Sequence, residues 1–132
     1  MIAIDTNVAV RFLLRDDEVQ WDAADHLFRG HEIAVGIMVG LELEWVVRGV
    51  YGLHRNDIVA ALRKLCGLPN VKMSDATMAS ELFTAYELGF DLADALHVLE
   101  ARKRNAEKFV TFDKALQKRA SRHDLGLGIE KL

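Results

Sequence analysis

Apolar residues follow two different patterns along the chain. Four short segments have the composition of strands, and the first of them, Ile2–Ile4, has no polar face. A strand without a polar face is typical of a parallel sheet that is buried on both sides. The other three predicted strands are Ile33–Val35, Val71–Met73 and Phe109–Thr111.

Between these segments, apolar residues recur at intervals of three and four, which predicts amphipathic helices. Glycines, polar caps and the single proline mark where the helices begin and end. The predicted helices run from Val8 to about Arg15, from Trp21 to Gly30, from Ile37 to Gly49 or Gly52, from His54 to Leu65, from Ser74 or Asp75 to Gly89, from Asp91 past Leu99, and from Lys114 to Ser121. Strands that alternate with helices, without hairpin signals, predict an α/β domain with a parallel sheet. No linker or repeat divides residues 1–132, so we expect a single domain.

The composition is that of a globular protein, with 51% hydrophobic and 28% charged residues among 132. The only cysteine, Cys66, lies among leucines and is predicted to be a buried structural thiol. A single cysteine fits a reducing, cytoplasmic setting. No signal peptide is evident, and the apolar run of residues 33–41 is too short to span a membrane.

Charge is unevenly distributed, although the formal net charge is only −3. Residues 1–47 hold three basic and nine acidic side chains, whereas residues 102–122 hold eight basic and two acidic ones. An acidic front and a basic rear suit a metal centre with a phosphate-bearing ligand nearby. From charge alone, a solvated helix surface is the simpler explanation.

Two carboxylates in the first half of the chain are candidates for chemistry. Asp5 follows the first strand, and the carboxyl ends of parallel strands are where ligands bind in such sheets, although a helix cap explains Asp5 equally well. Glu42 lies on an apolar helix with no basic side chain within a turn, and burying such a carboxylate is costly. Glu44, in contrast, has Arg48 four residues later, which predicts an ordinary surface ion pair.

Three more carboxylates follow in the second half. Asp91 and Asp94 lie one turn apart at the start of a helix, where Asp91 fits an N-cap and Asp94 a carboxylate favoured by the helix dipole. His97 continues this stripe and is interpreted as a packed or hydrogen-bonded histidine. Asp113 ends the fourth strand and could also cap a helix. Each acid alone is ambiguous, but all fall at or near strand ends or on the helix behind them.

Converging carboxylates would repel one another by roughly 4 kcal/mol per pair at about 4 Å, unless cations or protons neutralise them. Ligands that are all oxygen suit Mg²⁺ or Mn²⁺, which also bind phosphate oxygens. These features favour metal-assisted hydrolysis of phosphodiesters. Thr6, Asn7 and Thr111 are expected to orient the carboxylates or water.

Taken together and in order, four segments resemble the PIN-domain nucleases, and within them the VapC-type toxins of toxin–antitoxin pairs. The segments are Asp5-Thr6-Asn7, Leu41–Arg48 around Glu42, Asp91–His97, and Thr111-Phe112-Asp113. The resemblance implies a three-layer α/β/α fold with a short parallel sheet of four to five strands. It also implies an endoribonuclease that depends on Mg²⁺ or Mn²⁺, cuts structured RNA such as tRNA or rRNA, and thereby inhibits translation. A homodimer and an antitoxin that occludes the site are further implications.

Residue by residue, the resemblance makes Asp5, Glu42, Asp94 and Asp113 the catalytic metal ligands. It gives supporting polar roles to Thr6, Asn7, Asp91 and Thr111. The segment Gly36–Leu41 departs from relatives, which often carry a Ser or Thr there. Behind Asp113, we expect a stripe of basic residues to help hold RNA phosphate, namely Lys114, Lys118 and Arg122.

Other classes fit less well. Aspartyl-phosphate enzymes of the haloacid dehalogenase type need a second Asp two residues after the first, where this chain has Asn7. Response-regulator receivers need an acidic pair at the end of the first strand, which Thr6 and Asn7 do not supply. A catalytically inactive module that binds RNA or an antitoxin is the main alternative, and the intact acidic quartet argues against it.

Overall fold

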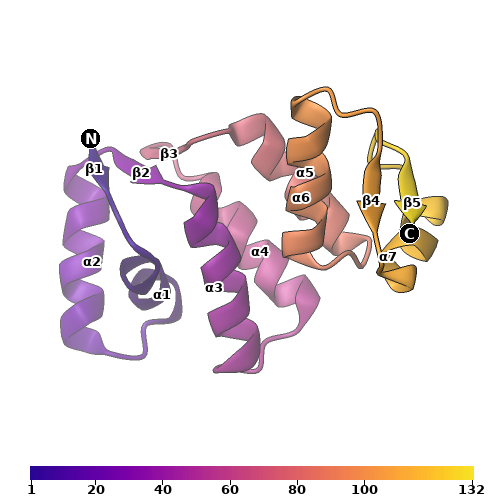
Figure 1. The fold of residues 1–132 in the computed structure, drawn as a ribbon. Coiled ribbons are helices and arrows are strands. Elements are labelled where there is room, and N and C mark those ends of the chain that lie inside the picture. The colour runs from indigo at the N-terminus through magenta and orange to yellow at the C-terminus, as the bar shows by residue number, and fades with distance from the viewer. The chain divides into compact units, whose positions relative to one another are not determined.

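The computed structural model describes all residues from 1 to 132, and the chain divides into two compact units, residues 1–79 and 80–132. Figure 1 follows the chain from its N-terminus to its C-terminus. The first unit contains β1 (Ile2–Ala3), α1 (Thr6–Leu14), α2 (Glu18–Gly30), β2 (Ile33–Val35), α3 (Ile37–Gly49), α4 (Arg55–Cys66) and β3 (Val71–Met73). Helix α5 (Ala76–Glu87) crosses the boundary between the units. The second unit continues with α6 (Leu92–Lys103), β4 (Phe109–Thr111), α7 (Lys114–Arg122) and β5 (Ile129–Lys131).

The first unit is built on a parallel sheet with the order β1-β2-β3. In the central strand, Ile33 is fully buried and Val35 is 2% exposed. The expectation of a buried first strand is wrong, because β1 ends at Ala3, with Ala3 exposed and Ile2 only half-buried. The position of β1 explains this, since it is an edge strand of this sheet and has a neighbour on one side only.

The second unit contains a sheet of two parallel strands, β4 and β5, in which Phe109 pairs with Ile129 and Thr111 with Lys131. The sequence pattern had not indicated β5, because its three residues near the end of the chain are Ile, Glu and Lys. The predicted α/β class is confirmed: five short strands are separated by helices, and every pairing is parallel.

Apolar faces of the helices form the cores. Phe12 of α1 stacks on Phe28 of α2, with ring centroids 3.9 Å apart and planes 4° from parallel. Leu43 of α3 and Leu62 of α4 are each 1% exposed. Cys66, at the end of α4, is free and half-buried rather than fully buried as predicted, and its burial raises the pKa of the thiol to about 11. No helix has both the length and the apolar composition needed to cross a membrane.

Candidate functional site

Asp5 lies between β1 and α1, at the carboxyl end of its strand as predicted. It is the N-cap of α1, and its Oδ1 accepts a hydrogen bond from the backbone N–H of Val8 at 3.1 Å. The cap satisfies one of the otherwise unpaired N–H groups of the first helical turn. The side chain is exposed, and its second oxygen, Oδ2, accepts no hydrogen bond within the protein. Asp5 is therefore both a structural cap and a carboxylate with a free oxygen.

The two glutamates of α3 are placed differently from the expectation. Glu42 is exposed, so the cost of burying a carboxylate does not arise there, and it lacks a partner within the protein as expected. The predicted pair of Glu44 with Arg48 is confirmed, with 2.7 Å between Arg48 Nε and Glu44 Oε1. However, Glu44 is not a surface residue, because its side chain is only 8% exposed while that of Arg48 is 52% exposed.

Helical geometry explains the reversal. The buried face of α3 repeats at intervals of three and four residues, through Gly40, Leu43, Glu44 and Val47. Glu42 falls outside that face, on the exposed part of the helix that also carries Met38 and Trp45, which are 60% and 67% exposed. Glu42 is thus an accessible carboxylate with exposed apolar neighbours.

In the second unit, three carboxylates are electrostatic neighbours. Asp91 is the N-cap of α6, and its Oδ1 accepts a hydrogen bond from the N–H of Asp94 at 3.0 Å. Burial raises the pKa of Asp94, the negative charges of Asp91 and Asp113 raise it further, and His97 lowers it. A carboxyl with a raised pKa beside two other acids holds its charge at a cost, which a cation would relieve.

Asp113 is fixed by three backbone contacts. Its Oδ1 accepts hydrogen bonds from the N–H groups of Ala115 at 2.8 Å and Leu116 at 3.1 Å, which makes it the N-cap of α7. The hydroxyl oxygen of Thr111 accepts a hydrogen bond from the N–H of Asp113 at 3.0 Å. Thr111 therefore orients the turn that carries Asp113. The other two polar residues predicted to have supporting roles lie at the start of α1, where Thr6 is buried and Asn7 is exposed.

The candidate ligands are all carboxylate oxygens, the type that Mg²⁺ and Mn²⁺ prefer in proteins. In the second unit, the negative charges of Asp91 and Asp113 raise the pKa of Asp94, which indicates a local excess of negative charge. In donor type and charge, these residues fit a hard divalent cation. In the arrangement of this structure, no three His, Cys, Asp or Glu side chains form a group that could hold a metal ion.

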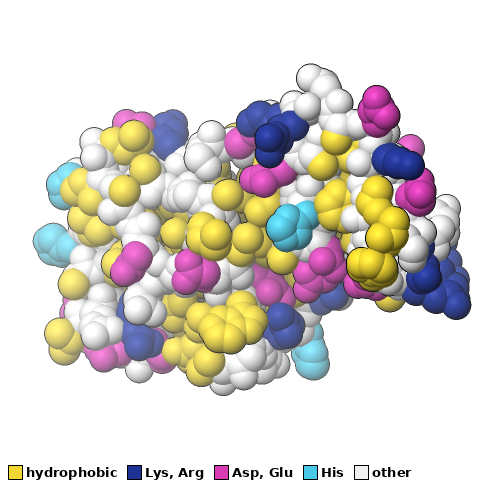
Figure 2. Space-filling view, in the orientation of Figure 1, with side chains coloured by type: hydrophobic (Ala, Val, Ile, Leu, Met, Phe, Trp, Pro, Cys, Tyr) yellow, Lys and Arg dark blue, Asp and Glu magenta, His cyan; other side chains and the backbone are white.

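The predicted basic stripe of α7 lies on the surface. Lys114, Lys118 and Arg122 are exposed, and none makes an ion pair or a side-chain hydrogen bond within the protein. In Figure 2, Lys and Arg side chains gather at the right of the view, where Figure 1 draws α7. The remaining arginine of this helix, Arg119, is occupied differently, since its Nη1 donates to the carbonyl oxygen of Leu88 at 3.2 Å.

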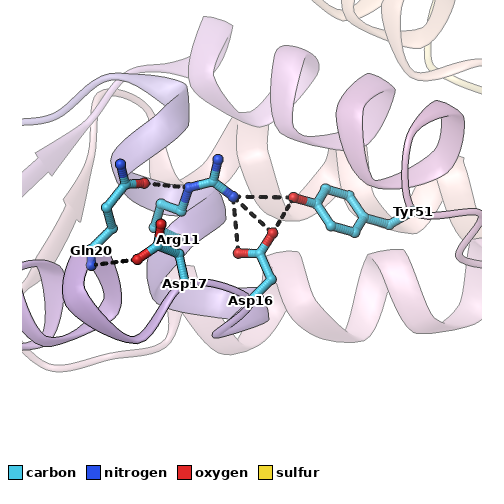
Figure 3. A network of polar contacts seen from close by, with 5 residues as sticks. All are labelled: Arg11, Asp16, Asp17, Gln20 and Tyr51. Carbon is cyan, nitrogen blue, oxygen red and sulfur yellow. Dashed lines mark hydrogen bonds and ion pairs between the residues drawn. The ribbon is translucent and has the colours of Figure 1, made fainter.

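One polar network was not foreseen from the sequence. In the first unit, Arg11 of α1 contacts Asp16, Gln20 and Tyr51 (Figure 3), and Arg11 and Gln20 also line a cavity beside Asp5. The one signal in the sequence was that Arg11 interrupts the apolar residues of its helix. Its partners lie 5, 9 and 40 positions away and follow no helical spacing that would have revealed them.

Comparisons with known proteins identify a family. Among curated proteins, none matches the chain. The family model of the PIN domain matches residues 2–122, which covers every candidate site residue. PIN domains are generally nucleases, and they commonly depend on divalent metal ions. The chain belongs to the PIN domain family.

Proposed function

We propose that the protein is an endoribonuclease that depends on Mg²⁺ or Mn²⁺ and hydrolyses phosphodiester bonds in structured RNA, such as tRNA or rRNA. Its membership of the PIN domain family supports nuclease activity in general. The observation that carries the proposal furthest is the crowding of Asp91, Asp94 and Asp113 in the second unit, where the pKa of Asp94 is raised. Such a concentration of carboxylates is costly to a fold and useful to a metal site.

In this proposal, Asp5, Glu42, Asp94 and Asp113 are the metal ligands. When bound, a divalent cation supplies an activated water and stabilises the charge that develops on the phosphate. Asp91 and Thr111 act as positioning residues. Asp91 accepts the N–H of Asp94, and Thr111 accepts the N–H of Asp113, so each fixes the backbone of a proposed ligand.

The test is cleavage of tRNA and rRNA by the purified protein with Mg²⁺, with Mn²⁺ and with EDTA. We expect cleavage with either ion, none with EDTA, and none by Asp5→Asn. Asp17→Asn is the matched control, because Asp17 is also an N-cap carboxylate that accepts a backbone N–H at 3.1 Å, but it is not a proposed ligand. If the protein cuts no RNA with any divalent ion, the nuclease proposal fails and an inactive RNA- or antitoxin-binding module becomes the better explanation.

We also propose that this nuclease is a VapC-type toxin that works in the cytoplasm as a homodimer and inhibits translation until an antitoxin occludes it. Support comes from the order and spacing of the acidic motifs along the chain. We expect expression of the protein to arrest growth, and co-expression of a small gene directly upstream to relieve the arrest. Growth arrest by Asp5→Asn equal to that by the unaltered protein would contradict this role.

For the substrate backbone, we propose that Lys114, Lys118 and Arg122 bind RNA phosphates. All three are exposed and unpaired, and they follow Asp113 at helical spacing. The logarithm of the RNA-binding constant falls linearly with the logarithm of the salt concentration, and each lost phosphate contact makes this negative slope shallower by roughly 0.7 to 0.9. Triple substitution with alanine should therefore reduce the slope by roughly 2 to 3. Lys64→Ala on α4 is the control, and an unchanged slope in the triple variant would refute the contact.

A further inference from the structure

The first unit contains a cavity of about 430 Å³ that lies beside Asp5, along α1 and α2. Val8 of α1 and Ala23 and Leu27 of α2 form an apolar part of its lining. The volume falls within the range of sites that bind small ligands. An apolar wall of this kind suits the flat face of an aromatic ring.

Two polar side chains of the lining have unused donors. Arg11 donates from Nε to Gln20 Oε1 at 2.6 Å, and from Nη1 to both carboxylate oxygens of Asp16 at 2.9 and 2.8 Å. These contacts leave Arg11 Nη2 and Gln20 Nε2 without a partner within the protein. In Figure 3, the two unused nitrogens point to the same side. The lining of the cavity therefore includes an apolar wall and two polar side chains, each with an unused donor.

The donors are held in place before any ligand binds. Tyr51 donates to Asp16 Oδ2 at 2.5 Å, and Arg11 Nη1 lies 3.2 Å from the Tyr51 hydroxyl. The backbone N–H of Gln20 donates to Asp17 Oδ1, which fixes the first turn of α2. Because the guanidinium is already ordered by these contacts, less conformational entropy is lost when it binds a ligand.

We propose that this cavity binds an unpaired nucleobase of the RNA substrate, specifically a guanine. Unpaired bases of RNA are recognised by stacking and by hydrogen bonds to their edges. Guanine presents two adjacent acceptors, O6 and N7, which match the two donors of Arg11 and Gln20. Adenine presents an acceptor and a donor at the same edge, so its amino group would face a donor. The inference rests on the proposed function, because Asp5 beside the cavity is a proposed metal ligand.

The test is binding of GMP and AMP to the full chain without divalent ions, followed by NMR of the backbone amides. The two nucleotides carry the same phosphate, so their difference in affinity reports the base. Ala23→Leu places extra volume in the cavity, and Gln20→Glu keeps the acceptor for Arg11 but removes the donor. The matched controls are Ala60→Leu and Asn56→Asp, both at exposed positions of α4.

We expect GMP to shift the amides of the cavity and to bind about tenfold more tightly than AMP, as one discriminating hydrogen bond predicts. Ala23→Leu should weaken the binding of GMP at least tenfold, and Gln20→Glu should abolish the preference for GMP over AMP. Both control variants should bind GMP and AMP with the affinities of the unaltered protein. If GMP shifts no cavity amide, or if Ala23→Leu binds it undiminished, the inference is overturned. The outcome is independent of cleavage, because Asp5→Asn should lose cleavage and retain the GMP preference.

Discussion

Asp5 has two roles that substitution can separate. As the N-cap of α1, it accepts the N–H of Val8 at 3.1 Å through Oδ1. Replacing an N-cap Asp with Ala costs about 1 kcal/mol, whereas Asn is as good a cap as Asp. In a domain of this size, 1 kcal/mol corresponds to about 4 °C in Tm. Without metal, we therefore expect Asp5→Ala to melt about 4 °C lower and Asp5→Asn to melt close to the unaltered protein.

The proposed metal role predicts a different ranking. A cation present at 100 times its Kd stabilises the folded state by about 2.7 kcal/mol, provided that the unfolded chain does not bind it. We expect Mg²⁺ to raise the Tm of the unaltered protein and of Asp17→Asn by several degrees. Asp5→Asn and Asp5→Ala should both lose most of this increase and all cleavage, because each lacks the ligand charge.

Thermal unfolding by circular dichroism, with EDTA and over a Mg²⁺ titration, gives both rankings, and RNA cleavage is measured on the same samples. If Asp5→Asn cleaves at the unaltered rate, Asp5 is only a cap and the metal assignment is refuted. If Asp5→Ala melts at the unaltered Tm in EDTA, the hydrogen bond that Asp5 accepts from Val8 does not stabilise the fold. These two outcomes are distinguishable, because the first concerns the charge of Asp5 and the second concerns its hydrogen bond.

Three further predictions concern stability and reactivity. Leu62→Ala, at a side chain that is 1% exposed, should cost 2 to 5 kcal/mol in urea unfolding, and a smaller loss would mean that α4 repacks. Hydrogen bonds from Tyr51 and, to a smaller extent, from Arg11 lower the pKa of Asp16 in the folded protein. The ionised carboxylate therefore stabilises the folded state at any pH above about 3.9, the ordinary pKa of Asp in an unfolded chain. At neutral pH, Asp16→Asn should therefore unfold at a lower urea concentration than the unaltered protein, and this difference should disappear as the pH falls through the lowered pKa of Asp16. A difference that persists in strong acid would contradict this. Because burial raises the pKa of the Cys66 thiol to about 11, Ellman's reagent at pH 8 should react far more slowly with the folded than with the urea-unfolded protein.

Local signals in the sequence located the elements well, because strands, caps and helical periodicity depend on neighbouring residues. Strand β3 was predicted at its observed bounds, and α2 ends at the expected Gly30. Strand β5 was missed, since three residues at a chain end carry little periodicity. The exposure of Glu42 and the burial of Glu44 depend on which face of α3 packs inward, and an apolar helix of this kind leaves that choice to tertiary contacts.

The same limit applies to Arg11 and its partners. The contact with Tyr51 joins positions 40 apart, and no local rule pairs an arginine with a tyrosine at that distance in sequence. In the sequence, Arg11 shows only as a charge within an apolar helix. That one of its donors is unused depends on the tertiary contacts of its other nitrogens with Gln20 and Asp16.

For three of the candidate acids, the sequence allows two interpretations, a helix cap and a functional carboxylate. The geometry shows that they are compatible, because Asp5, Asp91 and Asp113 each accept backbone N–H groups through Oδ1 alone. The second oxygen of each carboxylate accepts no hydrogen bond within the protein. A cap therefore fixes the direction of the carboxylate while leaving one oxygen for a ligand, and this pre-orientation lowers the entropy that binding would cost. Substitution by Asn, which keeps the cap and removes the charge, is for this reason the informative change at all three positions.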